Sequence, residues 1–82
     1  MIDLAALAWR YLAASDLLIS WDNDPESHME TYRQPGAGLY RDVQEAEHRA
    51  ADAFAAAAGI KSRSWRVLRP AAYSALAPEA KI

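Results

Sequence analysis

Apolar and polar residues follow one another along most of this chain with the spacing of amphipathic helices, which predicts an all-α fold, a small helical bundle. The first helix is expected from about residue 3 to about residue 21, with Asp3 as its N-cap. Its large apolar side chains cover more than half of its circumference, and they are Ile2, Leu4, Leu7, Trp9, Tyr11, Leu12, Leu18 and Ile19. So wide an apolar arc predicts that this helix is either central to the bundle or partly covered by a second subunit.

A second long helix is expected over about residues 39–58, where the periodicity is clearest. Its apolar stripe consists of Leu39, Val43, Ala46, Ala50, Ala53, Phe54 and Ala57, and its polar face of Arg41, Glu45, His48 and Asp52. Because alanine side chains are small, the large residues of the first helix are expected to pack closely against this stripe. Gly59 is expected to end the helix in the left-handed conformation, with Ile60 folding back onto the last turn.

The segment between these two helices is expected to hold a short helix and a turn. Asp24 can cap a helix over about residues 25–33, and Pro25 suits the first helical position. The Pro-Gly pair that follows predicts a turn over residues 34–38.

The C-terminal segment allows two interpretations. In the first, Ser62 or Ser64 caps a short helix that runs to Arg69, and Pro70 opens another helix that runs to about residue 77. In the second, residues 64–68 form a short strand, because large apolar and basic side chains alternate there. The first interpretation is favoured, so one or two short C-terminal helices are expected.

Length and composition narrow the class of protein. At 82 residues the chain is expected to form one domain, residues 1–82. It has no cysteine, which excludes disulfides and thiolate metal sites and fits a reducing compartment, so a cytoplasmic location is expected. Asp3, Arg10 and Asp16 interrupt the first apolar segment, which argues against a membrane span. Glu45 and His48 make a single pair of metal-ligand types on a polar face, so no metal and no cofactor are expected.

Positive charge is concentrated toward the C-terminus, whereas the first sixty residues are acidic. Residues 1–60 carry four basic and ten acidic side chains, and residues 61–82 carry five basic and one acidic. A basic cluster surrounds Trp65 and consists of Lys61, Arg63, Arg66 and Arg69. Such a cluster can neutralise phosphates or meet an acidic protein surface, and it can equally form a solvated face or pair with acidic residues of the same chain.

Residues 52–69 resemble a helix-turn-helix DNA-binding motif, a resemblance that covers less than a quarter of the chain. That family has a small residue four before a turn glycine, a β-branched residue after the glycine, and two apolar positions in the second helix. These places are occupied by Ala55, Gly59, Ile60, Trp65 and Leu68. The resemblance implies that phosphates and base edges are met by Lys61, Ser62, Arg63, Ser64, Arg66 and Arg69.

Catalysis is not expected, since cysteine is absent and neither His28 nor His48 has a serine partner at a known spacing. The sequence instead predicts a small non-enzymatic helical module for protein–protein interaction, of the accessory, inhibitor or adaptor kind found in phages and bacteria. It is expected to form a homodimer through Leu4, Trp9, Leu12 and Ile19, and to bind an unidentified protein partner through Lys61, Arg63, Trp65, Arg66 and Arg69. The alternative is a dimeric helix-turn-helix regulator that binds DNA through residues 52–69.

Overall fold

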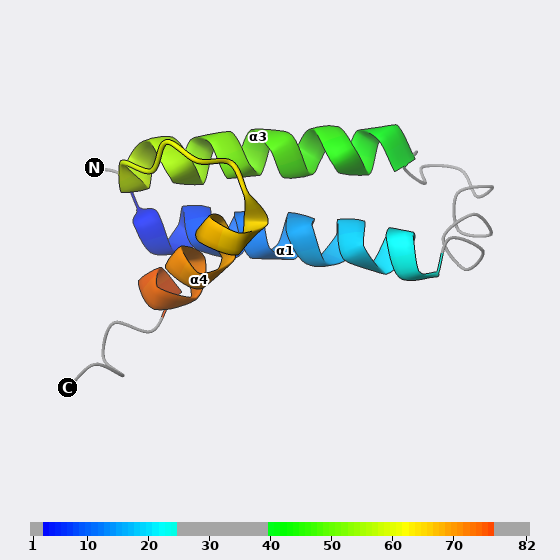
Figure 1. Ribbon diagram of the computed structural model, residues 1–82, viewed down its shortest axis with the longest axis horizontal. Coiled ribbons are helices and arrows are strands. Elements are labelled where there is room, and N and C mark those ends of the chain that lie inside the picture. Colours follow the sequence, from blue (N-terminus) through cyan, green and yellow to red (C-terminus); the bar gives the residue numbers. More distant parts are fainter. Residues whose placement is uncertain (1–2, 25–39, 77–82) are drawn as a thin grey trace.

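The computed structural model describes residues 3–24 and 40–76, and in these ranges it shows three α-helices and no strand. Helix α1 spans Leu4–Asn23, α3 spans Tyr40–Ala58 and α4 spans Trp65–Leu76. Helices α1 and α3 lie side by side and antiparallel, and α4 crosses α1 (Figure 1). The predicted all-α fold is therefore confirmed, while the helix expected over residues 25–33 and the turn over residues 34–38 lie outside the described residues.

Both ends of α1 have a local cause. The Asp3 carboxylate accepts a hydrogen bond from the Ala6 backbone N–H at 3.0 Å, so the predicted N-cap is confirmed. The helix continues to Asn23, two residues beyond the predicted end at Trp21. It does so because Trp21 is itself a packing residue, 8% exposed, whose ring lies 5.6 Å from that of Tyr40 at the start of α3.

The end of α3 forms a Schellman motif, as the sequence predicted. Gly59 has a φ of 72°, and its N–H donates to the Ala56 carbonyl at 3.3 Å. The Ile60 N–H donates to the Ala55 carbonyl at 2.8 Å, and the Ile60 side chain packs against the core. The motif turns the chain back along α3 toward the start of α4 (Figure 1).

Gly59→Ala is expected to lower the free energy of unfolding by about 1 kcal/mol, because an L side chain disfavours the left-handed conformation. A Cβ at this position would meet nothing within 4 Å, so the cost is one of backbone conformation alone. Urea denaturation measures it, and Gly59→Asn should cost less because asparagine tolerates this conformation. Equal losses for both variants would contradict this account.

Helix α4 confirms that one or two short helices follow residue 60: within residues 61–76 there is one, which runs through Pro70, and the alternative strand over residues 64–68 is wrong. Ser64 caps the helix: its hydroxyl accepts from the Arg66 N–H at 3.2 Å, and its carbonyl accepts from the Leu68 N–H at 2.9 Å. Pro70 lies in the second turn, where it removes one backbone hydrogen bond without ending the helix. Packing compensates for this loss, because an apolar stripe of helical spacing holds α4 in place; it consists of Leu68, Ala71, Ala72, Ala75 and Leu76.

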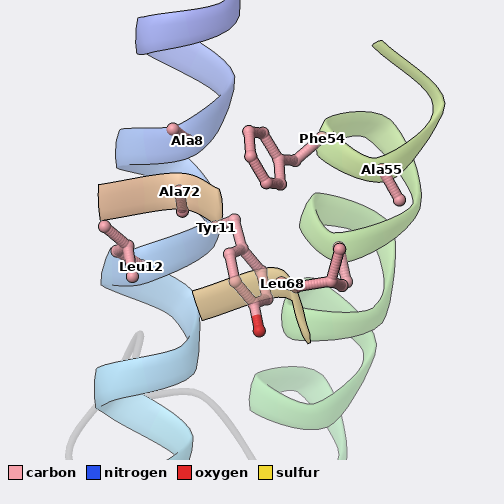
Figure 2. Close-up of a cluster of buried hydrophobic side chains, with 8 residues drawn as sticks. Ala8, Tyr11, Leu12, Phe54, Ala55, Leu68 and Ala72 are labelled. Carbon is pink, nitrogen blue, oxygen red and sulfur yellow. The ribbon is translucent and has the colours of Figure 1, made fainter. Parts of the chain in front are cut away.

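All three helices contribute to one core, which Figure 2 shows in close-up. The rings of Tyr11 and Phe54 stack with their planes 4° apart and their centroids 6.0 Å apart. The other buried members are small or aliphatic: Ala8 and Leu12 from α1, Ala51 and Ala55 from α3, and Leu68 and Ala72 from α4. The predicted packing of large α1 side chains against an alanine-rich face of α3 is thereby confirmed.

The buried stripe of α3 is rotated relative to the prediction. Its buried members are Val43, Ala51, Phe54 and Ala55, whereas the predicted Ala46 and Ala53 are exposed. Alanine occupies most positions in the second half of this helix, so it does not distinguish one face from another. The two bulky apolar residues of this helix, Val43 and Phe54, determine which face is buried. The predicted polar face is confirmed, since Arg41, Glu45, His48 and Asp52 are all exposed.

Candidate functional site: a groove beside α4

An open groove of about 730 Å³ lies where α1 and α3 extend past the start of α4. Its lining comes from the second half of α1, the middle of α3 and the first turns of α4 with the preceding connection. The lining residues are Ser15, Leu18, Ile19, Asp22, Glu47, His48, Ala51, Asp52, Arg63, Ser64, Trp65 and Arg69. The lining is therefore mixed, with apolar side chains and charged groups of both signs.

Arg69 fastens α4 to α1 at one side of the groove. Its guanidinium donates to the Ser15 hydroxyl at 2.7 Å, to the Asp16 carboxylate at 2.9 Å and to the Tyr73 hydroxyl at 3.1 Å. Burial alone would lower the pKa of Arg69, but the hydrogen bond and charge of Asp16 outweigh it, so the pKa lies above its ordinary value. Arg69 is thus a fixed cation that already has an anionic partner.

Arg63 likewise fastens another part of the groove lining, the connection before α4. Its Nε donates to the Asp52 carboxylate at 2.6 Å, and its Nη1 donates to the backbone carbonyls of Ile60 and Lys61 at 3.1 and 3.2 Å. This pair holds the connection between α3 and α4 against the middle of α3. Of the alternatives open for the basic cluster, pairing within the chain is the one that the structure shows for Arg63 and Arg69.

Trp65 stands at the edge of the groove with its side chain in solvent. It is 62% exposed, and the Arg66 guanidinium lies 5.4 Å from its ring centroid, within cation–π range. The helix-turn-helix resemblance placed Trp65 and Leu68 at the two positions that pack the second helix onto the first. Leu68 is fully buried there, whereas the placement of Trp65 is wrong, because its side chain is in solvent. The indole is a large apolar surface that the residues described by the structure leave mostly uncovered.

A buried tyrosine that does not itself line the groove lies near two polar lining residues, Ser15 and Glu47. The Tyr11 side chain is fully buried, its hydroxyl points away from Phe54 along the seam between α1 and α3 (Figure 2), and no described residue makes a hydrogen bond to it. Ser15 follows one turn later on α1. Glu47 lies across the seam on α3 with its side chain only 15% exposed, and its carboxylate is 3.7 Å from Nε2 of His48. Burial is the largest cause that raises the pKa of Tyr11, followed by the Glu47 charge, while the nearby Ser15 hydroxyl and the Arg69 charge lower it by less.

Tyr11→Phe is expected to raise the free energy of unfolding at pH 7 by about 1 kcal/mol, because it removes a buried hydroxyl that has no partner. The raised pKa of Tyr11 also implies a loss of stability in alkali. A tyrosine whose folded-state pKa exceeds its unfolded value of about 10 stabilises the fold below that pH and stops doing so as the pH rises through the folded value. Urea denaturation at pH 7 and at pH 10.5 measures both effects. Tyr11→Phe should lose less stability between these pH values than the wild type, and a variant less stable at pH 7 would contradict the expectation.

The predicted partner-binding residues separate into two groups. Arg63, Trp65 and Arg69 line the groove, whereas Lys61 and Arg66 are exposed outside it. Because Arg63 and Arg69 face aspartates of the same chain, the cluster is not a uniform positive surface.

The predicted self-association residues also separate. Leu12 is buried in the core of the single chain and is therefore not accessible to a second subunit, and Leu4 is half-buried against the same core. Trp9 and Ile19 are exposed, and Ile19 lines the groove. Self-association stays a prediction, which light scattering across dilution tests.

Three polar residues of the site were not singled out from the sequence: Ser15, Asp16 and Glu47. For Glu47 and Ser15 the sequence does contain a signal. Glu47 lies four residues from both Val43 and Ala51, and Ser15 lies four residues after Tyr11, so each is a polar residue within a buried stripe. Such positions can be recognised only when the buried face is assigned from the bulky residues and not from the alanines.

The connection between α3 and α4 is longer than the turn of a helix-turn-helix motif. That motif joins its helices by a turn of about three or four residues, whereas α3 ends at Ala58 and α4 begins at Trp65. Lys61 and Arg63 consequently lie in the connection and not on a recognition helix. DNA binding stays a prediction, which the salt dependence of affinity for duplex DNA tests.

Comparison of the chain with protein-family models, with curated proteins and with solved structures finds no match. Within residues 3–24 and 40–76, no group of three or more histidine, cysteine, aspartate or glutamate side chains is placed to hold a metal ion. None of the helices in these ranges has the length and apolar character needed to cross a membrane. The groove and the tryptophan at its edge are thus the features from which a function is inferred.

Proposed function

We propose that this chain is a small helical module that binds a segment of another protein in the groove beside α4. The observation that carries the proposal is the position of Trp65, which is 62% exposed at the edge of a groove of about 730 Å³. Tryptophan and arginine are the residues that most often dominate binding energy at protein interfaces, and they do so beside pockets from which water is excluded. Here Trp65, Arg63 and Arg69 line one groove.

The rigidity of the groove supports the same proposal. Its two sides are held by the pairs between Arg69 and Asp16 and between Arg63 and Asp52, at 2.9 and 2.6 Å. A surface that is ordered before binding loses less conformational entropy when a partner arrives. The groove therefore offers a preformed site with an apolar edge, which suits a segment that carries an apolar anchor.

Affinity capture with two matched tryptophan variants tests the proposal. The full chain is immobilised as wild type, Trp65→Ala and Trp9→Ala, an extract of the native host is applied, and the bound proteins are identified by mass spectrometry. Trp9 is 65% exposed and does not line the groove, so its variant removes an equal aromatic surface elsewhere. We expect a protein that the wild type and Trp9→Ala retain and Trp65→Ala loses. Retention of the same proteins by all three chains would refute binding at the groove.

A further inference from the structure

We propose that the segment bound in the groove carries a lysine or arginine whose cationic head group reaches the Glu47 carboxylate, with an apolar neighbour packed against Trp65. This inference rests on the proposed function, since it states which kind of segment the same groove selects. Three observations lead to it: the balance of charge in the groove, the partial burial of Glu47 and the exposed indole of Trp65 at the edge.

The charge balance leaves carboxylates in excess. Arg69 faces Asp16 and Arg63 faces Asp52, so both arginines of the lining are neutralised within the chain. Two lining carboxylates, of Asp22 and Glu47, then have no lysine or arginine partner in the part of the chain that the structure describes. Asp22 accepts a hydrogen bond from the Tyr40 hydroxyl at 2.6 Å, whereas the Glu47 carboxylate lies 3.7 Å from the His48 imidazole. Glu47 is therefore the site at which a partner's positive charge would be complementary.

Glu47 differs from an ordinary surface carboxylate in its burial. Its side chain is 15% exposed, so water screens its charge less than it screens that of an exposed glutamate. Glu45, two residues earlier on the same helix, is exposed and lies on the polar face. A cation that reaches Glu47 would thus gain more than one that meets Glu45.

The head groups of lysine and arginine suit a carboxylate of this kind. An ammonium offers three donors and a guanidinium five, so either can bond to both oxygens of the Glu47 carboxylate.

The apolar part of the lining accounts for the remainder of such a side chain. Leu18, Ile19 and Ala51 are the aliphatic residues of the lining, and Trp65 stands at the edge. Lysine and arginine have long aliphatic stems that pack against apolar surface while the head group reaches a polar one. An acidic or neutral polar side chain would leave Glu47 repelled or unpaired.

Selection from a displayed library of random dodecapeptides tests the inference with the full-length chain. Four baits are used: wild type, Glu47→Gln, Glu45→Gln and Trp65→Ala. Glu45→Gln makes the same chemical change as Glu47→Gln on the exposed face, which controls for net charge. Thermal unfolding of each bait verifies that it is folded. We expect wild type and Glu45→Gln to enrich peptides that pair a lysine or arginine with an apolar residue, and Glu47→Gln to lose the basic residue from its consensus.

A double-mutant cycle with one enriched peptide then measures the contact. Replacing its basic residue with norleucine should weaken binding to wild type about tenfold and leave binding to Glu47→Gln unchanged. A consensus without basic residues, or the same basic consensus with Glu47→Gln, would overturn the inference and leave the proposed groove intact. Peptides that bind Trp65→Ala as well as wild type would overturn both proposals.

Discussion

Replacing Leu68 with alanine is expected to lower the free energy of unfolding by about 2–5 kcal/mol, the range seen when a buried leucine is truncated and its cavity remains. Leu68 is one of the largest fully buried side chains and lies between α1 and α3, so it is the main apolar anchor of α4. A domain of this size has a total stability of only about 5–10 kcal/mol. The loss should therefore be visible as a marked fall in the denaturation midpoint and as detachment of α4.

Leu17→Ala is the matched control, because it removes the same atoms from a helix position that is 46% exposed. Its cost should stay within about 0.5 kcal/mol. Urea denaturation followed by circular dichroism measures both variants. Similar losses for the two would mean that α4 does not depend on the core for its position.

Arg69→Met is expected to cost about 1–3 kcal/mol, because it keeps the buried stem and removes every hydrogen bond of the guanidinium. The most important of these bonds goes to the hydroxyl of Ser15, which is buried and would lose its donor. The Asp16 carboxylate is exposed, so its ion pair with Arg69 should contribute less than 1 kcal/mol. Arg69→Met should change the shape of the groove more than the helix content, because Arg69 lines the groove.

Arg66→Met provides the comparison on the same helix. Arg66 is exposed and its guanidinium contacts the Trp65 ring, so the substitution should cost no more than about 0.5 kcal/mol. Denaturant unfolding ranks the two variants, and two-dimensional NMR shows whether the shifts of Ser15 and Tyr73 move in Arg69→Met alone. An Arg66→Met variant as unstable as Arg69→Met would show that Arg69 is not the residue that fastens α4.

The helix class and most helix ends follow from local chemistry, which is why the sequence predicts them well. Asp3 and Gly59 act through their own backbone surroundings, so their roles are readable from residue type and spacing. The continuity of α4 through Pro70 is different. It depends on Leu68 and Ala72 packing against two other helices, and a local preference for a break yields to that packing.

The candidate site was predictable only in part. The exposed Trp65 and the basic cluster were visible as unusual residues in the sequence. The pairs that neutralise Arg63 and Arg69 join residues 11 and 53 positions apart, and no periodicity indicates such partners. The role of Glu47 depends on which face of α3 is buried, and the many alanines of that helix hide its orientation.

Helix α4 covers only one portion of the α1–α3 pair, so the described part of the chain is packed by three helices at one end and by two at the other. Around Tyr11 and Phe54 three helices share one packed centre, so opening any of them requires the loss of contacts to two others. Beyond α4, within the ranges that the structure describes, α1 and α3 pack mainly against each other. A segment bound in the groove would lie beside the part of α1 and α3 that α4 does not cover, and binding would then slow the local opening of these two helices without any change of fold.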